Sequence, residues 1–283
     1  MQLVIISGKG GTGKTTVASS FAYLSENSIK CDCDVDASNL HIVLGGEDIY
    51  NKPYIGAKVA HVNQEKCTSC GACESMCRFD AIKNGIVDEL KCEGCAACTV
   101  VCDYNAITMA DEVTGNEIIT KTSKGILSRA HMIAGAEGSG KLVTDVRKNA
   151  FKYGAKDDLY ILDGTPGVGC AVMASVTGCD LALIIIEPSQ SGLNDFKRVL
   201  SVIEYFEIKP LVCINKYDIN EEITKEIQCY CKENNINVIG KIPFDSLVEQ
   251  SINELKPIVL YKDSFAGKEI IKIWNSINEL ITV

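Results

Sequence analysis

The sequence predicts an α/β fold in which a doubly wound, mostly parallel sheet carries a small inserted module. Two observations lead to this prediction. Short apolar runs alternate with helix-forming segments over most of the 283 residues, which is typical of strands buried between two layers of helices. A cysteine-rich stretch interrupts the alternation once, and the alternation then resumes.

The first elements follow this scheme closely. The apolar run at 2–7 is bounded by glycine and predicts a buried parallel strand. Helix-forming spacing from 14 to 26 follows it, and then a strand near 29–35. A further strand over 55–62 leads into the cysteine-rich stretch.

The cysteine-rich region, from about 58 to 110, contains two copies of one pattern at an offset of 25 residues, from Cys67 to Cys92. Similar tails, RFDAIKNG and DYNAITMA, follow the two copies. We interpret this as an internal duplication in which each half forms a loop, a short helix and a strand. The predicted domains are therefore 1–57 with 111–283, and an insertion over 58–110.

The rest of the chain returns to strand–helix alternation. The segments 116–122 and 126–134 predict a β-hairpin, and 140–153 predicts a helix. Strands are then expected at 159–163, 181–187, 210–215 and 236–243, and helices near 170–177, 192–206, 220–233 and 265–281. The last helix is amphipathic but has few basic residues, so we expect it to close the core rather than to bind a membrane.

Composition excludes several classes of protein. The chain is 46% hydrophobic and 23% charged, as in soluble globular proteins. Its net charge of −9 disfavours a DNA-coating role, which needs a basic face. No apolar run reaches the roughly 18 residues of a membrane span, and no basic leader follows Met1. We expect a cytoplasmic protein without nucleic-acid binding or stable membrane association.

A phosphate-binding loop is predicted at the start of the chain. GKGGTGKT, residues 8–15, fits G-x-x-x-x-G-K-[ST] and lies between a strand and a helix, as the motif requires. Its backbone N–H groups and the helix N-terminus favour phosphate. Lys14 is expected to reach the β- and γ-phosphates, and the Thr15 hydroxyl to bind Mg²⁺. The predicted nucleotide-binding residues here are Gly8, Gly10, Gly11, Thr12, Gly13, Lys14, Thr15 and Thr16.

A second glycine-rich stretch, GAEGSGK at 135–141, matches part of the same motif. Leu142 stands where a Mg²⁺-binding hydroxyl is needed, and no buried strand abuts the stretch. We interpret it as a turn before a helix.

The segment LYILDGTPG supplies the other half of the nucleotide site. Its apolar strand ends at Asp163, which is placed to hold the water shell of Mg²⁺. Residues 164–169 would then form a mobile loop that senses the γ-phosphate. The alternative is an ordinary strand that ends in an Asp-Gly turn.

These residues resemble the MinD, ParA and nitrogenase iron-protein superfamily. Lys9 completes KGGTGKT, which is similar to the deviant Walker A motif of that superfamily. CDVDASNLHIVLG (33–45) resembles the first switch, and DGTPG the second. CINKYD and IPFDSLVEQS resemble the adenine-binding end.

The resemblance implies an ATPase that sandwiches ATP in a dimer, either a homodimer or a heterodimer with a similar ATPase. Lys9 would reach the partner's phosphates and supply positive charge in the transition state. Asp36 would orient the attacking water. Asn215 would contact adenine and Pro243 would flank it, although Asn215 also suits a strand-end turn.

The cysteine spacing is C-x2-C-x2-C-x3-C, given twice. In two-cluster bacterial ferredoxins the fourth cysteine of each run ligates the other cluster. The sequence therefore predicts two [4Fe–4S] clusters, one held by Cys67, Cys70, Cys73 and Cys102 and the other by Cys77, Cys92, Cys95 and Cys98. A zinc site would instead show separated pairs. With this insertion the chain resembles MinD-superfamily ATPases that contain a ferredoxin domain.

The ferredoxin pattern ends in Cys-Pro, whereas Arg78 and Asp103 follow the fourth cysteines here. Proline is not a ligand, so ligation should survive, but the cluster potentials are expected to shift. Each of the other seven cysteines is expected to be a small buried hydrophobe: Cys31, Cys33, Cys170, Cys179, Cys213, Cys229 and Cys231. Cys31, Cys33 and Cys170 lie near the two switches, where cysteines of the nitrogenase iron protein and a nickel-inserting relative bind metal, so metal binding is the alternative.

The sequence thus predicts an iron–sulfur ATPase that couples Mg²⁺-dependent ATP hydrolysis to the delivery of electrons or metal clusters during maturation of a partner metalloprotein. Two alternatives remain. One is an ATP-gated reductase of a redox acceptor, and the other is a positioning ATPase like MinD or ParA.

Overall fold

The computed structural model describes residues 1–136, 139–155 and 158–282, and these residues fold as two compact units. Unit 1 contains Met1–Lys52, Glu117–Met132 and the described chain from Ser139 onward. Unit 2 contains Pro53–Asn116 and Ile133–Ala136. It therefore extends beyond the predicted insertion, 58–110, at both ends.

One large sheet organises unit 1. In spatial order its strands are β11 (Asn237–Ile242), β10 (Lys209–Asn215), β9 (Leu181–Ile186), β1 (Gln2–Ile6), β8 (Tyr160–Asp163), β2 (Ser28–Asp32), β7 (Gly125–Met132), β6 (Ile107–Thr122) and β3 (Glu47–Val62). The pairings from β11 through to β7 are all parallel. The predicted mostly parallel α/β sheet is therefore confirmed.

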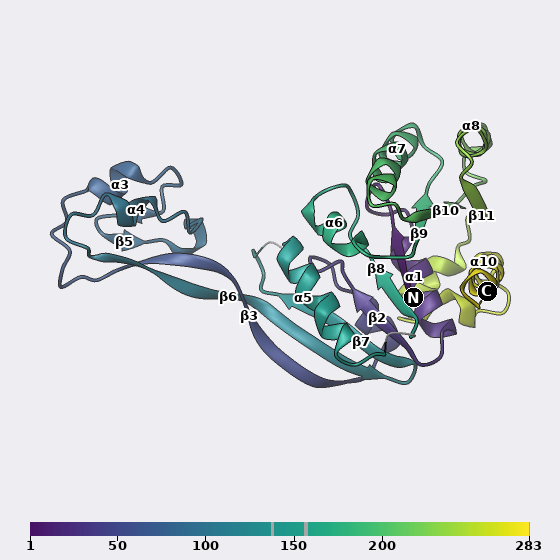
Figure 1. The fold of residues 1–283 in the computed structure, drawn as a ribbon, viewed down its shortest axis with the longest axis horizontal. Helices are drawn as coiled ribbons and strands as arrows, with labels where there is room; N and C mark the ends of the chain where they lie inside the picture. The colour runs from purple at the N-terminus through teal and green to yellow at the C-terminus, as the bar shows by residue number, and fades with distance from the viewer. Residues whose placement is uncertain (137–138, 156–157, 283) are drawn as a thin grey trace. The chain divides into compact units, whose positions relative to one another are not determined.

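Helices cover both faces of this sheet. On one face Leu3 and Ile5 of β1 join a core cluster with α1 (Lys14–Leu24) and α10 (Phe265–Thr282), which lie side by side in Figure 1. The alternate residues of β1, Val4 and Ile6, are fully buried on the other face. The sheet is thus doubly wound, as predicted.

The other described helices of unit 1 are α2 (Leu40–Leu44), α5 (Gly140–Phe151), α6 (Cys170–Val176), α7 (Gln190–Tyr205), α8 (Glu221–Glu233) and α9 (Leu247–Asn253). Of these, α5 to α8 fall close to their predicted places, whereas α2 and α9 were not predicted. Helix α5 begins inside the second glycine-rich stretch, of which residues 137–138 lie outside the described residues. Among the described helices, none is both long and apolar enough to cross a membrane.

The C-terminal helix α10 closes the core, as its sequence predicts. Ile270, Ile273 and Ile277 are at most 2% exposed. The Trp274 ring packs on Phe21 of α1 with 5.1 Å between centroids. Its apolar stripe therefore faces the core of unit 1.

Strands β3 and β6 are far longer than the sequence indicates, with 16 residues each against predictions of 55–62 and 116–122. They are antiparallel, because Thr120 bonds Asp48 near one end and the Asn63 amide donates 2.8 Å to the Ala106 carbonyl near the other. Most β3 side chains are exposed on both faces. The apolar alternation that marks a half-buried strand is therefore weak here.

The sequence duplication in unit 2 is repeated in its backbone. Helices α3 (Ala72–Met76) and α4 (Ala97–Val100) stand at the same offset as the cysteine runs. Left-handed conformations recur at that offset in three pairs, Ser69 with Gly94, Gly71 with Ala96, and Asp80 with Asn105. A small antiparallel ladder joins β4 (Ile82–Lys83) to β5 (Ile86–Val87). The predicted duplication is confirmed.

Candidate functional site

The predicted phosphate loop connects the end of β1 to the start of α1. Gly11 and Gly13 have φ of +77° and +88°, conformations that favour glycine. A Cβ on Gly13 would run into the Asn215 side chain. The Asn215 amide donates 2.7 Å to the Thr12 carbonyl, so the end of β10 supports the loop directly.

Lys14 occupies a buried position among carboxylates. Its Nζ lies 2.5 Å from Asp163 Oδ1 and 3.3 Å from Asp34 Oδ2. Burial lowers the pKa of Lys14, but the negative charges of Asp163 and Asp34 outweigh it and raise the pKa above its ordinary value. The structure thus brings together Lys14 and Asp163, both predicted site residues.

Asp32 adds a second buried carboxylate beside Asp163. The two residues are register partners at the ends of the parallel strands β2 and β8. Burial, and then the charge of Asp163, raise the pKa of Asp32 to about 7. The Asp32 carboxylate accepts bonds from Ser38 Oγ at 2.8 Å and from the Leu40 amide at 3.1 Å, and so holds the segment that follows β2.

Asp34 is a site residue that sequence reasoning missed. The structure places its carboxylate on Lys14, whereas Asp36, which the resemblance predicts to orient the attacking water, is exposed. Strand β2 ends at Asp32, earlier than the predicted 29–35. The acidic residues of CDCDVD alternate, so the sequence pattern alone does not show whether Asp34 or Asp36 lies at the site. The position at which the strand ends was the signal that could have told them apart.

Lys9 lies against the start of α7. Its Nζ donates to Ser189 Oγ at 3.1 Å and to Ser191 Oγ at 3.5 Å. Ser189 also caps α7 by accepting a bond from the Gly192 amide at 3.0 Å. The Lys9 ammonium is therefore held by its own chain at a helix N-terminus, where the helix dipole disfavours a cation.

The other predicted residues of the loop have distinct surroundings. Gly8 packs on α7, where a Cβ would come within 2.6 Å of Asp195. Gly10 is exposed, and Thr15 is partly buried in the first turn of α1. The predicted sensing segment starts beside the loop, because the Gly164 amide donates 2.8 Å to the Ile5 carbonyl and the Gly167 amide 3.0 Å to that of Ser7.

A cavity of about 270 Å³ adjoins the phosphate loop. Thr16, Asn215 and Pro243 line it, together with Gly11 and Gly13. Its remaining wall is largely apolar and includes Phe244, Val248, Ile252 and Ile270. An apolar cavity with a few polar groups, beside a phosphate loop, suits the flat ring of a nucleobase. The structure therefore brings Asn215 and Pro243 to one cavity, although the Asn215 amide nitrogen already bonds the loop.

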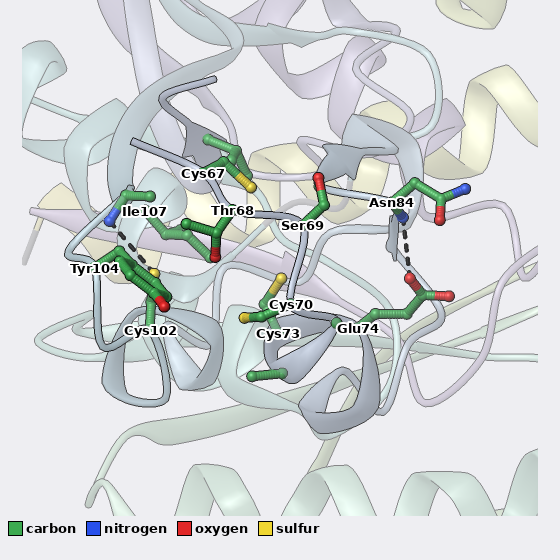
Figure 2. Close-up of a pocket in the computed structure, with 15 residues that line it drawn as sticks. Cys67, Thr68, Ser69, Cys70, Cys73, Glu74, Asn84, Cys102, Tyr104 and Ile107 are labelled. Atoms are coloured by element: carbon green, nitrogen blue, oxygen red, sulfur yellow. Dashed lines mark hydrogen bonds between the residues drawn. The ribbon is translucent and has the colours of Figure 1, made fainter. Parts of the chain in front are cut away.

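The eight cysteines of the two runs line two cavities in unit 2, four to each. Cys67, Cys70, Cys73 and Cys102 line the first, and Figure 2 shows Cys102 reaching it from the segment of Tyr104 and Ile107, across from Cys70 and Cys73. Cys77, Cys92, Cys95 and Cys98 line the second. These are the same two sets that the spacing predicts.

The surroundings of the sulfurs are apolar, with backbone donors. Backbone amides approach three of them, Ala81 to Cys77 and Ala106 to Cys102 at 3.4 Å each, and Ala60 to Cys92 at 3.5 Å. Burial raises the pKa of the Cys73 and Cys98 thiols. In the part of the chain that the structure describes, no three His, Cys, Asp or Glu side chains are arranged to hold a single metal ion.

The remaining seven cysteines are mostly buried. Cys31, Cys33, Cys179, Cys213 and Cys231 are buried, whereas Cys170 and Cys229 are exposed. Burial raises the pKa of Cys31 to about 12 and that of Cys33 well above its ordinary value. The prediction of small buried hydrophobes is therefore confirmed for these five and wrong for Cys170 and Cys229.

Residues 3–258 match the model of the CobQ/CobB/MinD/ParA nucleotide binding domain. The chain belongs to this family. It is 34% identical to the uncharacterized protein MJ0578 of Methanocaldococcus jannaschii over 99% of this chain and 98% of the relative. The matched range includes both the phosphate loop at 8–15 and the segment 163–169.

Solved structures show the same fold. The septum site-determining protein MinD of Pyrococcus horikoshii, complexed with Mg-ADP, covers 99% of this chain and 96% of its own at 20% identity, with a TM-score of 0.60. A variant of McdA from Cyanothece, in complex with ATP, covers 100% and 96% at 17% identity, also with a TM-score of 0.60. The MinD-like P-loop fold predicted from the sequence is therefore confirmed.

Proposed function

We propose that this protein is an iron–sulfur ATPase. Mg²⁺-dependent ATP binding and hydrolysis in unit 1 would drive the delivery of electrons or iron–sulfur units from unit 2 during maturation of a partner metalloprotein. The observation that carries the proposal is the grouping of eight cysteines into two cavities of four, in the same chain as a family phosphate loop.

The cysteine cavities fit [4Fe–4S] clusters on chemical grounds. Each offers four thiols, and amide N–H groups point at sulfur in both, as is common around such clusters. Four thiols that bind the four corners of a cluster lie further apart than the ligands of one ion, so the lack of a single-ion group in the described residues is compatible with this. Ala60, Val62, Ile82 and Ile107 form an apolar core beside the sulfurs.

The ligand sets proposed are those of the cavities, Cys67, Cys70, Cys73 and Cys102 for one cluster and Cys77, Cys92, Cys95 and Cys98 for the other. The clusters would supply one-electron transfer at a potential on the order of −400 mV, or iron and sulfur for transfer. The inserted ferredoxin-like domain would comprise residues 58–110 within unit 2.

The chain's own residues would act on ATP as follows. The loop amides of residues 8–13 would bind phosphate oxygens, and the phosphates would draw Lys14 away from Asp163 and Asp34. Thr15 and Asp163 would hold Mg²⁺. Asp34, whose carboxylate would then be released beside the reacting end, is better placed than the exposed Asp36 to orient water.

Lys9 would act across a dimer. Its ammonium is held by Ser189 and Ser191 rather than by an anion, so a partner's phosphates would offer it a more favourable site. The structures of relatives add that MinD of Aquifex aeolicus forms a complex with MinC. For this chain we propose a homodimer, or a heterodimer with a similar ATPase.

Anaerobic purification with iron counting and EPR tests the proposal. About eight irons per chain that remain bound through ATP turnover would favour electron transfer, including the ATP-gated reductase. Iron that passes to an apo-acceptor only during turnover would favour cluster donation. A chain that holds no cluster after anaerobic reconstitution, yet hydrolyses ATP, would overturn the iron–sulfur function.

A MinD- or ParA-like positioning ATPase is the second candidate, and the likeness to MinD and McdA structures favours it. The buried apolar face of α10 argues against a membrane-binding C-terminal helix. Co-sedimentation of the full chain with anionic vesicles separates the two candidates. Binding that requires ATP would favour positioning, and its absence would favour the iron–sulfur function.

A further inference from the structure

Arg129 of β7 is a buried cation that bonds a carboxylate and a hydroxyl group. Its side chain is 8% exposed. Nη2 donates to both carboxylate oxygens of Asp48, at 3.1 and 2.9 Å, and Nε donates to Thr120 Oγ1 at 3.0 Å. Thr120 in turn donates 2.6 Å to Asp48. We call Asp48, Thr120 and Arg129 the clasp. The Asp48 side chain is 43% exposed, but both of its oxygens accept from a buried guanidinium, and such charge-assisted bonds are geometrically specific.

The clasp joins the three strands that lead from unit 1 into unit 2. Strand β3 leaves unit 1 after Lys52, β6 enters it at Glu117, and β7 ends at Met132, after which the chain continues into unit 2. Each strand contributes one clasp residue, which lies within a few positions of the residue where unit 1 ends or begins. The clasp therefore fixes the strand ends from which unit 2 is built, and all of its bonds lie within unit 1.

A short segment connects the clasp to the nucleotide site. Asp32, at the carboxylate group around Lys14, holds this segment through Ser38 and the Leu40 amide at the start of α2. After α2 the chain passes Gly46, whose φ is +126°. A Cβ there would lie 2.5 Å from the Lys121 carbonyl of β6. Asp48 follows two residues later, so the segment is tied down at both ends.

Helix α2 also places His41 within electrostatic range of the clasp. Burial lowers the pKa of His41, Arg129 and His131 lower it further, and Asp48 opposes them. These charges act on His41 only because the ring lies close to the clasp. The His41 Nδ1 is buried without a hydrogen-bond partner, so α2 presents a polar group there whose environment changes if the helix shifts.

We propose that the clasp is the joint through which the nucleotide site controls the cysteine-bearing unit. When phosphates draw Lys14 away from Asp163 and Asp34, the carboxylates at the end of β2 lose their compensating charge, and the segment from Asp32 to Asp48 readjusts. The clasp passes that change to β3, β6 and β7, the three strands at which the chain crosses between unit 1 and unit 2. This inference rests on the proposed function, because it supplies the connection between ATP and the clusters.

Hydrogen exchange of the full chain, reconstituted anaerobically with iron and sulfide, tests the joint. Exchange is compared with and without Mg²⁺ and a non-hydrolysable ATP analogue. In the wild type, nucleotide should change exchange in 53–62 and 107–116 by about fivefold or more, the lower end of ordinary coupling. In Asp48→Asn and Thr120→Val the change should fall below about twofold, while protection of residues 8–17 and ATP hydrolysis persist.

Asp111→Asn is the matched control. Asp111 pairs with Lys58 at 3.2 Å on the same two strands, but both side chains are more than half exposed and neither touches the clasp. This variant should respond to nucleotide like the wild type. Both clasp variants must also retain the wild-type iron content and melting temperature within a few degrees, and the more stable of the two decides the result.

The outcomes separate the inference from the function. If the wild type responds and the folded clasp variants respond equally, the joint lies elsewhere and the proposed function stands. If nucleotide protects 8–17 in the wild type but leaves 53–62 and 107–116 unchanged, both the joint and the coupling of ATP to the clusters are overturned. If nucleotide does not protect 8–17 at all, the ATPase itself is overturned.

Discussion

The ammonium of Lys14 lies 2.5 Å from the carboxylate of Asp163, and this pair joins the start of α1 to the end of β8. Both side chains are buried, with exposures of 6% and 1%. In this structure the cation intended for phosphate is thus balanced by the protein's own carboxylates. Under the proposed function ATP would compete with Asp163 and Asp34 for Lys14, so its binding would rearrange charge where β8 and β2 end.

Lys14→Ala should abolish ATP hydrolysis, with a loss of at least about 100-fold, because no other described cation stands among these carboxylates. It should also lower the free energy of unfolding by up to about 3 kcal/mol, since it leaves buried carboxylates uncompensated. Phosphate release and denaturant titration measure the two effects. Iron content should not change, because every residue lining the cysteine cavities belongs to unit 2. Iron loss in this variant would refute the separation of the two sites.

Asp34→Ala should slow hydrolysis by about 100-fold or more, as expected for a residue that positions the attacking water. Asp36→Ala should slow it by less than about threefold, because its carboxylate is exposed and Asp34 contacts Lys14. The two substituted residues lie two positions apart in an alternating run, so the variants form a matched pair. Single-turnover hydrolysis with ATP binding measured separately compares them. The reverse ranking would restore the role inferred for Asp36 from the family resemblance.

The stability of the nucleotide-free protein should fall as pH rises from about 4 to about 7. The pKa of Asp32 is raised to about 7 in the folded state, chiefly by burial and then by Asp163. The folded state therefore binds more protons than the unfolded state between these values, and the free energy of unfolding decreases with pH by at most about 4 kcal/mol. Denaturant midpoints at pH 5 and pH 8 measure the slope.

Asp32→Asn supplies the control for this pH dependence. Its side-chain oxygen can still accept a bond from Ser38 or Leu40, but the group no longer ionises. Its midpoints should therefore differ less between pH 5 and pH 8 than those of the wild type. An unchanged slope in this variant would assign the pH dependence to another group.

The sequence predicted those parts of the candidate site that depend on local chemistry. The loop at 8–15 has its own backbone signature, and the spacing of Cys67 to Cys102 specifies which thiols share a cavity. Asp163 was found because an apolar strand ends there. In each case the prediction depends on a pattern formed by residues that are close together in the sequence.

What the sequence did not reveal depends on long-range contacts. The length of β3 comes from backbone pairing with β6, while Pro53, Gly56 and the exposed side chains hide any strand pattern. Asp34 became distinguishable from Asp36 only when the end of β2 was fixed by its pairing with β8. The clasp joins residues up to 81 positions apart. A single sequence carries no pattern that would indicate a contact over that separation.

Serine variants of the fourth cysteines test the proposed ligand sets most directly. Cys102→Ser should lose the same cluster as Cys67→Ser, because both line the first cavity, although Cys102 belongs to the second run in sequence. Cys77→Ser and Cys92→Ser, as separate single variants, should each lose the other cluster.

Each single variant should fall from about eight irons to about four. The double variant Cys67→Ser with Cys102→Ser should keep those four. EPR of the reduced proteins, with Cys170→Ser as the control outside both cavities, identifies which signal remains. If Cys67→Ser with Cys102→Ser removes both signals while the control retains them, each run holds its own cluster and the crossed assignment is wrong.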